Sequence, residues 1–473
     1  MPSRVPLLAL FRLLFVLCAV QARAQESSYH MDADHRRIRL QLYAPGIIRV
    51  SISPDTAMPH GASLSVNALP VRAGATASRR GDTLVITTGE MTVRVNGPAG
   101  DIRFLDKKGK QFLAAGGPDG GSFVKRTPEE GYHVSQHFTL TPEEGIYGLG
   151  QFEDPIVNYR GQDIRIAQAN RTAVNPFLVS TQGYGILWDN YSRSRFADGG
   201  GTTLFESEVG DDIDYYVVYG PALDRVVGGY RLLTGKAPLA GKWAFGYWQS
   251  RERYKSGSEL IGIVREYRRR GIPLDNIVQD WSYWGGMDQF SSMMWDSVNY
   301  PEPGRMTDSL HALHAHVMVS IWPAFGTATG IFREMNERKL LYGVPHWNGG
   351  KVYDAYDPAA REIYWHYVKK GLFDNGVDAY WMDATEPEFR CSDDRYITEL
   401  SIKQAGRNFL GDFARYLTPY SLMTTRAVYE NHRLATDRKR VFILTRSSFA
   451  GQQRYGAATW SGDTFATWDA LRV

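Results

Sequence analysis

The second half of the chain alternates short, almost continuously apolar segments with longer segments of helical periodicity. The apolar segments are predicted to be strands, at 243–248, 276–280, 317–322, 379–383, 441–444 and 457–460. The segments between them are predicted to be helices, at 258–269, 306–315, 358–373 and 400–417. Such an alternation is typical of a parallel sheet, either a closed barrel or a doubly wound sheet. The sequence contains no glycine-rich phosphate loop, which weakens a nucleotide-binding interpretation.

The first half has a different pattern. From about residue 29 to 205, apolar and polar residues alternate in short runs such as 37–43, 83–87 and 91–95, with turn residues between them. This spacing predicts an antiparallel β-sandwich. A helical stretch near residue 222 marks the change of pattern. The predicted organisation is a β-sandwich over 25–220, followed by the α/β part over 221–473.

The N-terminus is predicted to be a secretory signal peptide over 1–24. An apolar run, too short for a membrane span, precedes small residues at 22–24, so cleavage is expected after Ala24 and the mature protein is expected to be secreted or periplasmic. The peptide carries three arginines and no acid, and its removal takes the formal charge from +3 to zero. A neutral chain gives no support for nucleic-acid binding. Cys391 would then be the single cysteine, without a disulfide partner.

Polar or aromatic residues follow most of the predicted strands in the second half. They are Trp248, Asp280, Trp322, Asp383, Arg446 and Asp463. In a parallel barrel these positions converge on one pocket. Asp383 and Asp463 each have a tryptophan close by in the sequence, at Trp381 and Trp460. Paired carboxylates beside aromatic rings are typical of enzymes that hydrolyse glycosidic bonds, because this reaction needs one carboxylate as nucleophile or base and another as acid.

The segments that contain these residues resemble glycoside hydrolase family 31, and its α-xylosidases most closely. The resembling segments are, in chain order, 147–151, 183–190, 246–254, 279–281, 381–387 and 460–463. The resemblance covers nearly the whole mature chain. It implies an N-terminal antiparallel β-sandwich followed by a (β/α)8 barrel, of which this chain contains about six strands.

Carried over to this chain, the resemblance implies that Asp383 is the nucleophile and Asp463 the general acid/base. Two successive displacements retain the anomeric configuration, so their carboxyl groups are expected about 5–5.5 Å apart. Arg446 is expected to favour the ionised form of Asp383. Asp280 is expected to hold hydroxyl groups at the non-reducing end of the sugar.

Tryptophans are expected to wall the pocket, at Trp248, Trp322 and Trp460. Trp381 lies two residues before Asp383, so it should face the same side of its strand and narrow the pocket. Glu386 and Glu388 follow on the loop and are candidate substrate contacts. No cofactor or metal is expected. The histidines His311, His314 and His316 run across a predicted helix-to-strand boundary, are separated by alanine and leucine, and are expected to have no acid or cysteine that completes a metal set.

The expected function is a retaining α-glycosidase, an α-xylosidase that releases α-linked xylose from xyloglucan-type oligosaccharides. An α-glucosidase of the same family is the near alternative. An inactive, truncated carbohydrate-binding remnant is the alternative from another class, because a closed barrel takes eight strands. A barrel with two strands missing would expose sheet edges and core, so poor stability is expected. The oligomeric state does not follow from the sequence.

Overall fold

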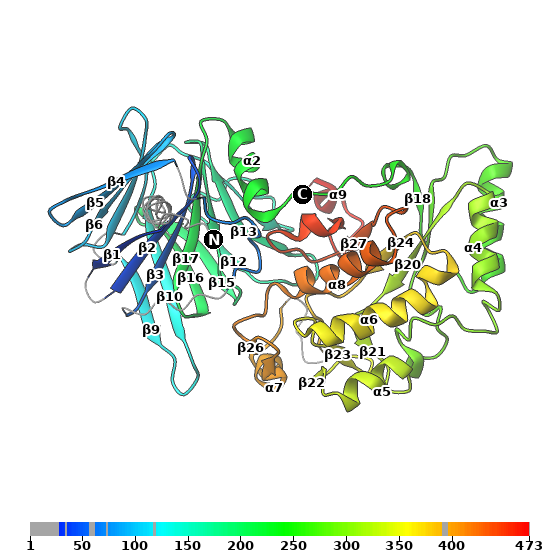
Figure 1. Cartoon of the computed structure of the whole chain (residues 1–473). Helices are drawn as coiled ribbons and strands as arrows, with labels where there is room; N and C mark the ends of the chain where they lie inside the picture. The colour runs from blue at the N-terminus through cyan, green and yellow to red at the C-terminus, as the bar shows by residue number, and fades with distance from the viewer. Residues whose placement is uncertain are drawn as a thin grey trace, which may run out of the picture.

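The computed structural model describes residues 28–33, 36–55, 62–71, 74–116, 120–389 and 396–472. Within them the chain forms an antiparallel β-sandwich and a partial barrel of parallel strands, which lie side by side (Figure 1). This confirms the predicted fold class. The predicted signal peptide and Cys391 lie outside the described residues.

Two sheets make up the sandwich. One contains, in spatial order, β1 (Ser28–Ala33), β2 (Arg36–Ala44), β3 (Ile47–Ser53), β17 (Ile213–Tyr219), β14 (Tyr184–Trp188), β13 (Ala173–Ser180) and β11 (Ile146–Gln151). The other contains β12 (Asp163–Ile166), β15 (Ser194–Gly199), β16 (Thr202–Gly210), β10 (Tyr132–Thr139), β8 (Gln111–Ala115), β7 (Asp101–Asp106), β6 (Met91–Asn96), β5 (Thr83–Thr88) and β4 (Ala75–Arg80), with β9 (Gly121–Lys125) beside β10. In β6, Val93 and Val95 are buried and Arg94 is exposed, so the alternation in the sequence buries one face of the strand.

The partial barrel has six parallel strands in the described residues. Their order is β18 (Trp248–Gln249), β19 (Asn276–Gln279), β20 (His316–Ile321), β24 (Ala379–Met382), β27 (Ile443–Thr445) and β28 (Ala457–Thr459). Its principal helices are α3 (Gly257–Arg269), α4 (Pro303–Ala312), α6 (Pro358–Gly371) and α8 (Tyr420–Ala435). Along β24, Tyr380 and Met382 pack in the core that contains the helices, whereas Ala379 and Trp381 pack in the smaller interior cluster. A strand that is apolar on both faces is therefore covered on one face by helices and on the other by the barrel interior.

Smaller elements complete the fold. An insertion between β20 and α6 holds β21 (Ala324–Phe325), α5 (Gly330–Glu337), β22 (Leu341–Pro345) and β23 (Lys351–Tyr353). The segment after β24 holds α7 (Glu399–Ala405) and the hairpin of β25 (Arg407–Asn408) and β26 (Gly411–Asp412). Short 3-10 helices occur at η1 (Lys242–Phe245), η2 (Met287–Gln289), η3 (Phe373–Asn375) and η4 (Gln452–Tyr455). The connecting helix α2 (Leu223–Thr234) and the terminal helix α9 (Trp468–Arg472) both lie near the junction of the two parts (Figure 1).

Two predicted elements were wrong in extent. The first strand, expected over 243–248, is a strand only at Trp248–Gln249, because 242–245 forms η1. The helix expected over 400–417 ends at Ala405, where Gly406 takes a φ of 68° that other residues rarely adopt. Helix α8 was not predicted. It buries residues around much of its circumference, which removes the one-sided pattern by which surface helices are recognised.

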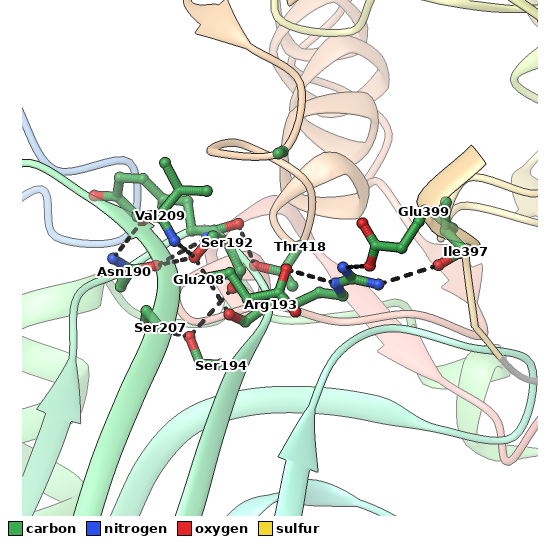
Figure 2. Close-up of polar contacts among 12 residues, drawn as sticks. Asn190, Ser192, Arg193, Ser194, Ser207, Glu208, Val209, Ile397, Glu399 and Thr418 are labelled. Carbon is green, nitrogen blue, oxygen red and sulfur yellow. Dashed lines mark hydrogen bonds and ion pairs between the residues drawn. The ribbon is translucent and has the colours of Figure 1, made fainter. Parts of the chain in front are cut away.

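The junction between the two parts is both apolar and polar. The core cluster of the sandwich also contains residues of the partial barrel, which is called the half-barrel from here on. These residues are Leu422, Phe449 and Tyr455. Arg193, at 6% exposure, reaches across from the sandwich (Figure 2). Its Nε donates to Glu208 at 2.8 Å, its Nη1 donates to the carbonyl of Ile397 at 3.5 Å, and its Nη2 pairs with Glu399. The sandwich is thus held against the segment that follows β24.

Candidate active site

Asp383 follows β24 directly and is only 9% exposed. Its Oδ1 accepts a hydrogen bond from the backbone N–H of Ala384 at 2.7 Å. Ala384 has a φ of 51°, so the chain turns sharply just after the carboxylate. One residue later, the hydroxyl of Thr385 contacts that of Thr445 at 2.5 Å, which ties the end of β24 to the end of β27. Asp383 therefore stands on a turn that two neighbouring strands fix.

Arg446 follows β27 and is the centre of the charged cluster. Its side chain is 4% exposed, and its guanidinium contacts four carboxylates. The distances are 3.5 Å to Asp383, 2.6 Å to Glu386, 3.3 Å to Glu388 and 3.2 Å to Asp463. A planar guanidinium can hold several oxygens in fixed directions, so Arg446 sets the relative positions of these acids.

Burial dominates the electrostatics of this cluster. It raises the pKa of Asp383 to about 6, against the charge of Arg446, which lowers it. Burial likewise raises the pKa of Glu388 to about 7, and Arg446 again acts in the opposite direction. Burial by itself would lower the pKa of Arg446, but the surrounding carboxylates outweigh it and the pKa is raised. The guanidinium therefore stays charged, and Asp383 is mostly ionised at neutral pH.

Asp463 lies in the loop after β28, and its side chain is 71% exposed. Its Oδ2 accepts hydrogen bonds from Arg446 Nη1 at 3.2 Å and from Asn170 Nδ2 at 2.6 Å. The same Arg446 nitrogen lies 3.5 Å from Asp383 Oδ1. The two carboxylate oxygens can therefore be no farther apart than the sum of these two contacts to Arg446. Such a bound accommodates the separation of about 5–5.5 Å that a retaining enzyme needs.

Asp280 and Trp322 stand at the ends of the neighbouring strands β19 and β20, each 8% exposed. Asp280 Oδ1 accepts the backbone N–H of Trp281 at 2.6 Å. Burial raises the pKa of Asp280 to about 7, the bond from Trp281 lowers it, and the charge of Asp383 raises it further. The ring of Trp322 packs against Phe290 at 5.1 Å, and its indole N–H has no partner in the described part of the chain.

Trp381 and Trp460 meet edge to face, with ring centroids 5.3 Å apart. Trp381 packs on the interior cluster, on the face of β24 from which Asp383 continues, and its indole N–H is buried without a partner among the described residues. Trp248 lies elsewhere. Its ring packs at 5.3 Å on Phe442, which precedes β27, whereas Arg446 follows that strand. The structure thus does not bring Trp248 to the carboxylates.

The histidines considered in the sequence lie away from this site. His311 Nε2 contacts Asp378 at 2.7 Å, and His316 Nδ1 contacts the same carboxylate at 3.4 Å. Asp378 precedes β24 and His316 begins β20, so this cluster is at the amino ends of the strands. Across the described residues, no set of three metal-binding side chains could hold an ion.

No described helix has the length and apolar character that crossing a membrane would require.

The sequence analysis did not identify Asn170 as a site residue. It lies between β12 and β13 of the sandwich, about 290 residues before its partner Asp463. Its only sequence signal is the Asn-x-Thr pattern with Thr172, which points to glycosylation rather than to a catalytic contact. Because the contact crosses between the two parts of the molecule, no local pattern could have indicated it.

Residues 237–473 match the family description "Glycosyl hydrolases family 31 TIM-barrel domain". Residues 37–196 match "Glycosyl hydrolase 31 N-terminal galactose mutarotase-like domain". The chain belongs to glycoside hydrolase family 31. This membership confirms the resemblance inferred from segments such as 381–387 and 460–463.

The chain is similar to several α-xylosidases of family 31. It is 42% identical over 353 residues to an α-xylosidase of Saccharolobus solfataricus, an alignment that covers 72% of this chain and 46% of that protein. The solved structure of an α-xylosidase from Xanthomonas citri superposes with a TM-score of 0.87 at 27% identity, covering 94% of this chain and 66% of the other. An α-xylosidase from a soil metagenome, solved with xylose, gives 0.86 at 27% identity, with 94% and 68% covered. The chain thus spans about half the length of the Saccharolobus relative.

Proposed function

We propose that this chain carries the catalytic centre of a retaining α-glycosidase that acts on α-linked xylose of oligosaccharides. The observation that carries the proposal is the contact of Asp383 and Asp463 with one nitrogen of Arg446, at 3.5 and 3.2 Å. The resulting upper limit on the separation of the two carboxylate oxygens admits the ~5–5.5 Å of retaining enzymes and excludes nearly all of the ~6.5–9.5 Å range that inverting enzymes use. The choice of xylose is supported by similarity to proteins named as α-xylosidases, one of them solved with xylose.

In the proposed first step, the carboxylate of Asp383 attacks the anomeric carbon while the bond from that carbon to the leaving oxygen breaks. Asp463 transfers its proton to that oxygen. In the second step, water attacks the same carbon, its proton passes to Asp463, and Asp383 is released as a carboxylate. Each displacement inverts the carbon, so the released sugar keeps the α configuration.

Ionisation and burial suit these roles. With a pKa of about 6, Asp383 is ionised at neutral pH, and the charge of Arg446 favours that form. Asp280 offers its carboxyl oxygens to sugar hydroxyls, in hydrogen bonds that are stronger in its ionised form, which predominates above its pKa of about 7. Trp322 and Trp381 have buried indole N–H groups that no described residue accepts, so they remain available as donors. Glu386 keeps one buried oxygen without a partner in the described residues and is a further candidate contact.

The test uses the full chain with aryl α-xyloside and aryl α-glucoside, beside the Asp383→Ala variant. The matched control is Asp374→Ala, because Asp374 is half exposed and pairs with Lys369 at 2.7 Å. We expect the xyloside to be hydrolysed faster, Asp383→Ala to be inactive and the control to be active. NMR of the first product should show α-xylose. Equal rates for Asp383→Ala and the wild-type chain would remove Asp383 as nucleophile, and initial release of the β anomer would contradict retention.

Faster hydrolysis of the glucoside would favour the α-glucosidase alternative. No turnover, combined with binding of xylose in calorimetry, would favour the carbohydrate-binding alternative.

Export is also proposed, from the signal peptide predicted over 1–24. N-terminal sequencing of the exported protein should begin at Gln25, and retention of residues 1–24 would contradict cleavage.

A further inference from the structure

A loop of the β-sandwich reaches the proposed acid Asp463. The loop spans 167–172, between β12 and β13, on the side of the sandwich that faces the half-barrel (Figure 1). Asn170 in this loop makes two hydrogen bonds with Asp463. Its Nδ2 donates to Asp463 Oδ2 at 2.6 Å, and its Oδ1 accepts the backbone N–H of Asp463 at 3.0 Å. The amide thus contacts both the carboxylate and the backbone that supports it.

The loop itself is anchored on the half-barrel by Gln168, which is 4% exposed. Its Nε2 donates to the carbonyl of Thr418 at 3.2 Å and to the carbonyl of Ser448. Its Oε1 accepts the backbone N–H of Val174 at 3.2 Å. Ser448 lies two residues after Arg446, so the loop that carries Asn170 is tied to the segment that carries the central guanidinium. Asn170 therefore stands on a fixed support.

Close packing on the other side completes the contact. Gly462, the residue before Asp463, has a φ of 81°. A Cβ at this position would lie 2.5 Å from the backbone nitrogen of Arg171 and 2.7 Å from Asn170 Oδ1. Real Cβ atoms do not approach backbone atoms so closely, so the two loops can meet in this way only with glycine at position 462.

We infer that Asn170 is a positioning residue for the acid/base, and that it assigns the catalytic proton to Oδ1 of Asp463. Oδ2 faces N–H donors from Asn170 and Arg446. A proton on Oδ2 would point at these donors, whereas Oδ1 has no partner in the described part of the chain. Oδ1 is thus the atom that gives the proton to the leaving oxygen and later accepts one from water. The inference rests on the proposed function.

The first test measures how each variant depends on the leaving group. Asn170→Ala should lower kcat/KM about tenfold or more for phenyl α-xyloside, whose leaving group needs a proton. The loss should be under about threefold for the dinitrophenyl xyloside, whose leaving group departs without one. The control is Asn299→Ala, because Asn299 is exposed and also donates to an aspartate, Asp296, at 2.5 Å. Equal losses for both substrates would mean that Asn170 only supports binding or folding, and would overturn the inference.

The second variant, Asn170→Asp, separates the two hydrogen bonds. It keeps an oxygen that can accept the N–H of Asp463, but it places a second carboxylate against Oδ2. Two facing carboxylates cannot both ionise easily, so one proton is held to higher pH. The alkaline limb of the kcat/KM profile should therefore move to higher pH. An unchanged profile would contradict the assignment of Oδ2 as the oxygen held by Asn170.

A third measurement does not depend on turnover. Amide hydrogen exchange of a peptide covering 460–466 should be faster in Asn170→Ala than in the wild-type chain, because the bond to the N–H of Asp463 is lost. Asn299→Ala should leave it unchanged. Unchanged exchange in Asn170→Ala would overturn the positioning role even in a chain without activity. Conversely, inactivity of the wild-type chain together with faster exchange would count against the proposed function and leave the positioning supported.

Discussion

The two proposed catalytic carboxylates are held in opposite ways. Asp383 is 9% exposed and is fixed by the turn after its own strand, within the half-barrel. The side chain of Asp463 is 71% exposed and is fixed by Asn170, from the β-sandwich. Arg446 contacts both. The proposed nucleophile is therefore built into one part of the molecule, whereas the proposed acid is placed by contact between two parts.

This difference suits the two roles. A nucleophile meets a single atom, the anomeric carbon, and a rigid, water-excluding setting favours that geometry. A general acid/base exchanges its proton with the leaving oxygen and then with water, so it has to remain accessible. Under the proposed roles, the sandwich supplies the support for an acid that is too exposed to be held by burial.

The largest expected effect compares Asp383→Asn with Asp463→Asn. Asp383→Asn should lower kcat/KM by about 10⁴-fold or more for every aryl α-xyloside, because no covalent intermediate can form. Asp463→Asn should lower it about 10²–10⁴-fold for phenyl xyloside and far less for the dinitrophenyl compound. Stopped-flow and steady-state assays across the leaving groups would measure this. If both variants lose the same factor for all substrates, the division of roles is wrong.

The positions of the site residues at strand ends could be predicted because they depend on local patterns, whereas the division of roles between Asp383 and Asp463 is implied by the family resemblance and stays a prediction. Asp280, Asp383 and Arg446 each follow a short apolar strand, and parallel strands bring those ends together. The sandwich strands could be predicted for the same reason, because a buried position every second residue is visible in segments such as β6. Each of these features is determined by residues that lie close together in the sequence.

The features that could not be predicted depend on contacts between distant segments. Asn170 reaches Asp463 only because the sandwich docks on the half-barrel, and its own sequence pattern indicates glycosylation. The first turns of helix α8, from Tyr420 to Thr425, are buried all round, so this part of the helix lacks the polar face by which a surface helix is recognised. In the sequence, Trp248 is followed by polar residues, which is the pattern of a strand end. In the structure it packs on Phe442, which precedes β27, whereas Arg446 follows that strand at the other end of the barrel interior.

The second prediction removes the residue that both carboxylates share. Arg446→Met should destabilise the protein at pH 7 by about 3–5 kcal/mol, because it leaves Asp383 and Glu386 buried without their cation. It should also raise the pKa of Asp383, so the acidic limb of kcat/KM should move above its position near pH 6. Chemical denaturation and pH-rate profiles would measure the two effects. An unchanged acidic limb would show that Arg446 does not control Asp383.

The third prediction concerns stability and separates the two carboxylates again. Burial raises the pKa of Asp383 to about 6 in the folded protein, so above that pH the folded protein holds a buried carboxylate that costs stability relative to the unfolded chain. Asp383→Asn should therefore raise the free energy of unfolding at pH 7.5 by about 1–3 kcal/mol. This gain should shrink as the pH falls through about 6, where the wild-type carboxyl takes up its proton. Asp463→Asn, at an exposed position, should change stability little. Denaturant titrations at several pH values would check both, and a loss of stability in Asp383→Asn would contradict the burial argument.

The smallest expected effect comes from a third carboxylate, Asp378, whose side chain is buried about as deeply as that of Asp383, at 11% and 12% exposure. Burial also acts to raise its pKa, but the hydrogen bond to His311 and the contact with His316 outweigh burial and lower it. The pKa of His311 is raised in turn, chiefly by its bond to Asp378. Because its pKa is lowered, Asp378 stabilises the fold at pH values above about 4. Because its pKa is raised, His311 stabilises the fold at low pH and loses this contribution as the pH rises through its pKa. The pair therefore stabilises the fold most at pH values between these two limits.

Asp378→Asn should therefore destabilise the protein by about 1 kcal/mol at pH 5.5, and by less as the pH rises and His311 loses its proton. The same substitution at Asp383 is expected to stabilise, so two aspartates of equal burial should respond with opposite signs. His366→Asn serves as a control, since it changes a histidine outside this cluster. Equal signs for the two aspartate variants in parallel denaturation curves would mean that burial alone, and not the cations beside each carboxylate, decides their ionisation.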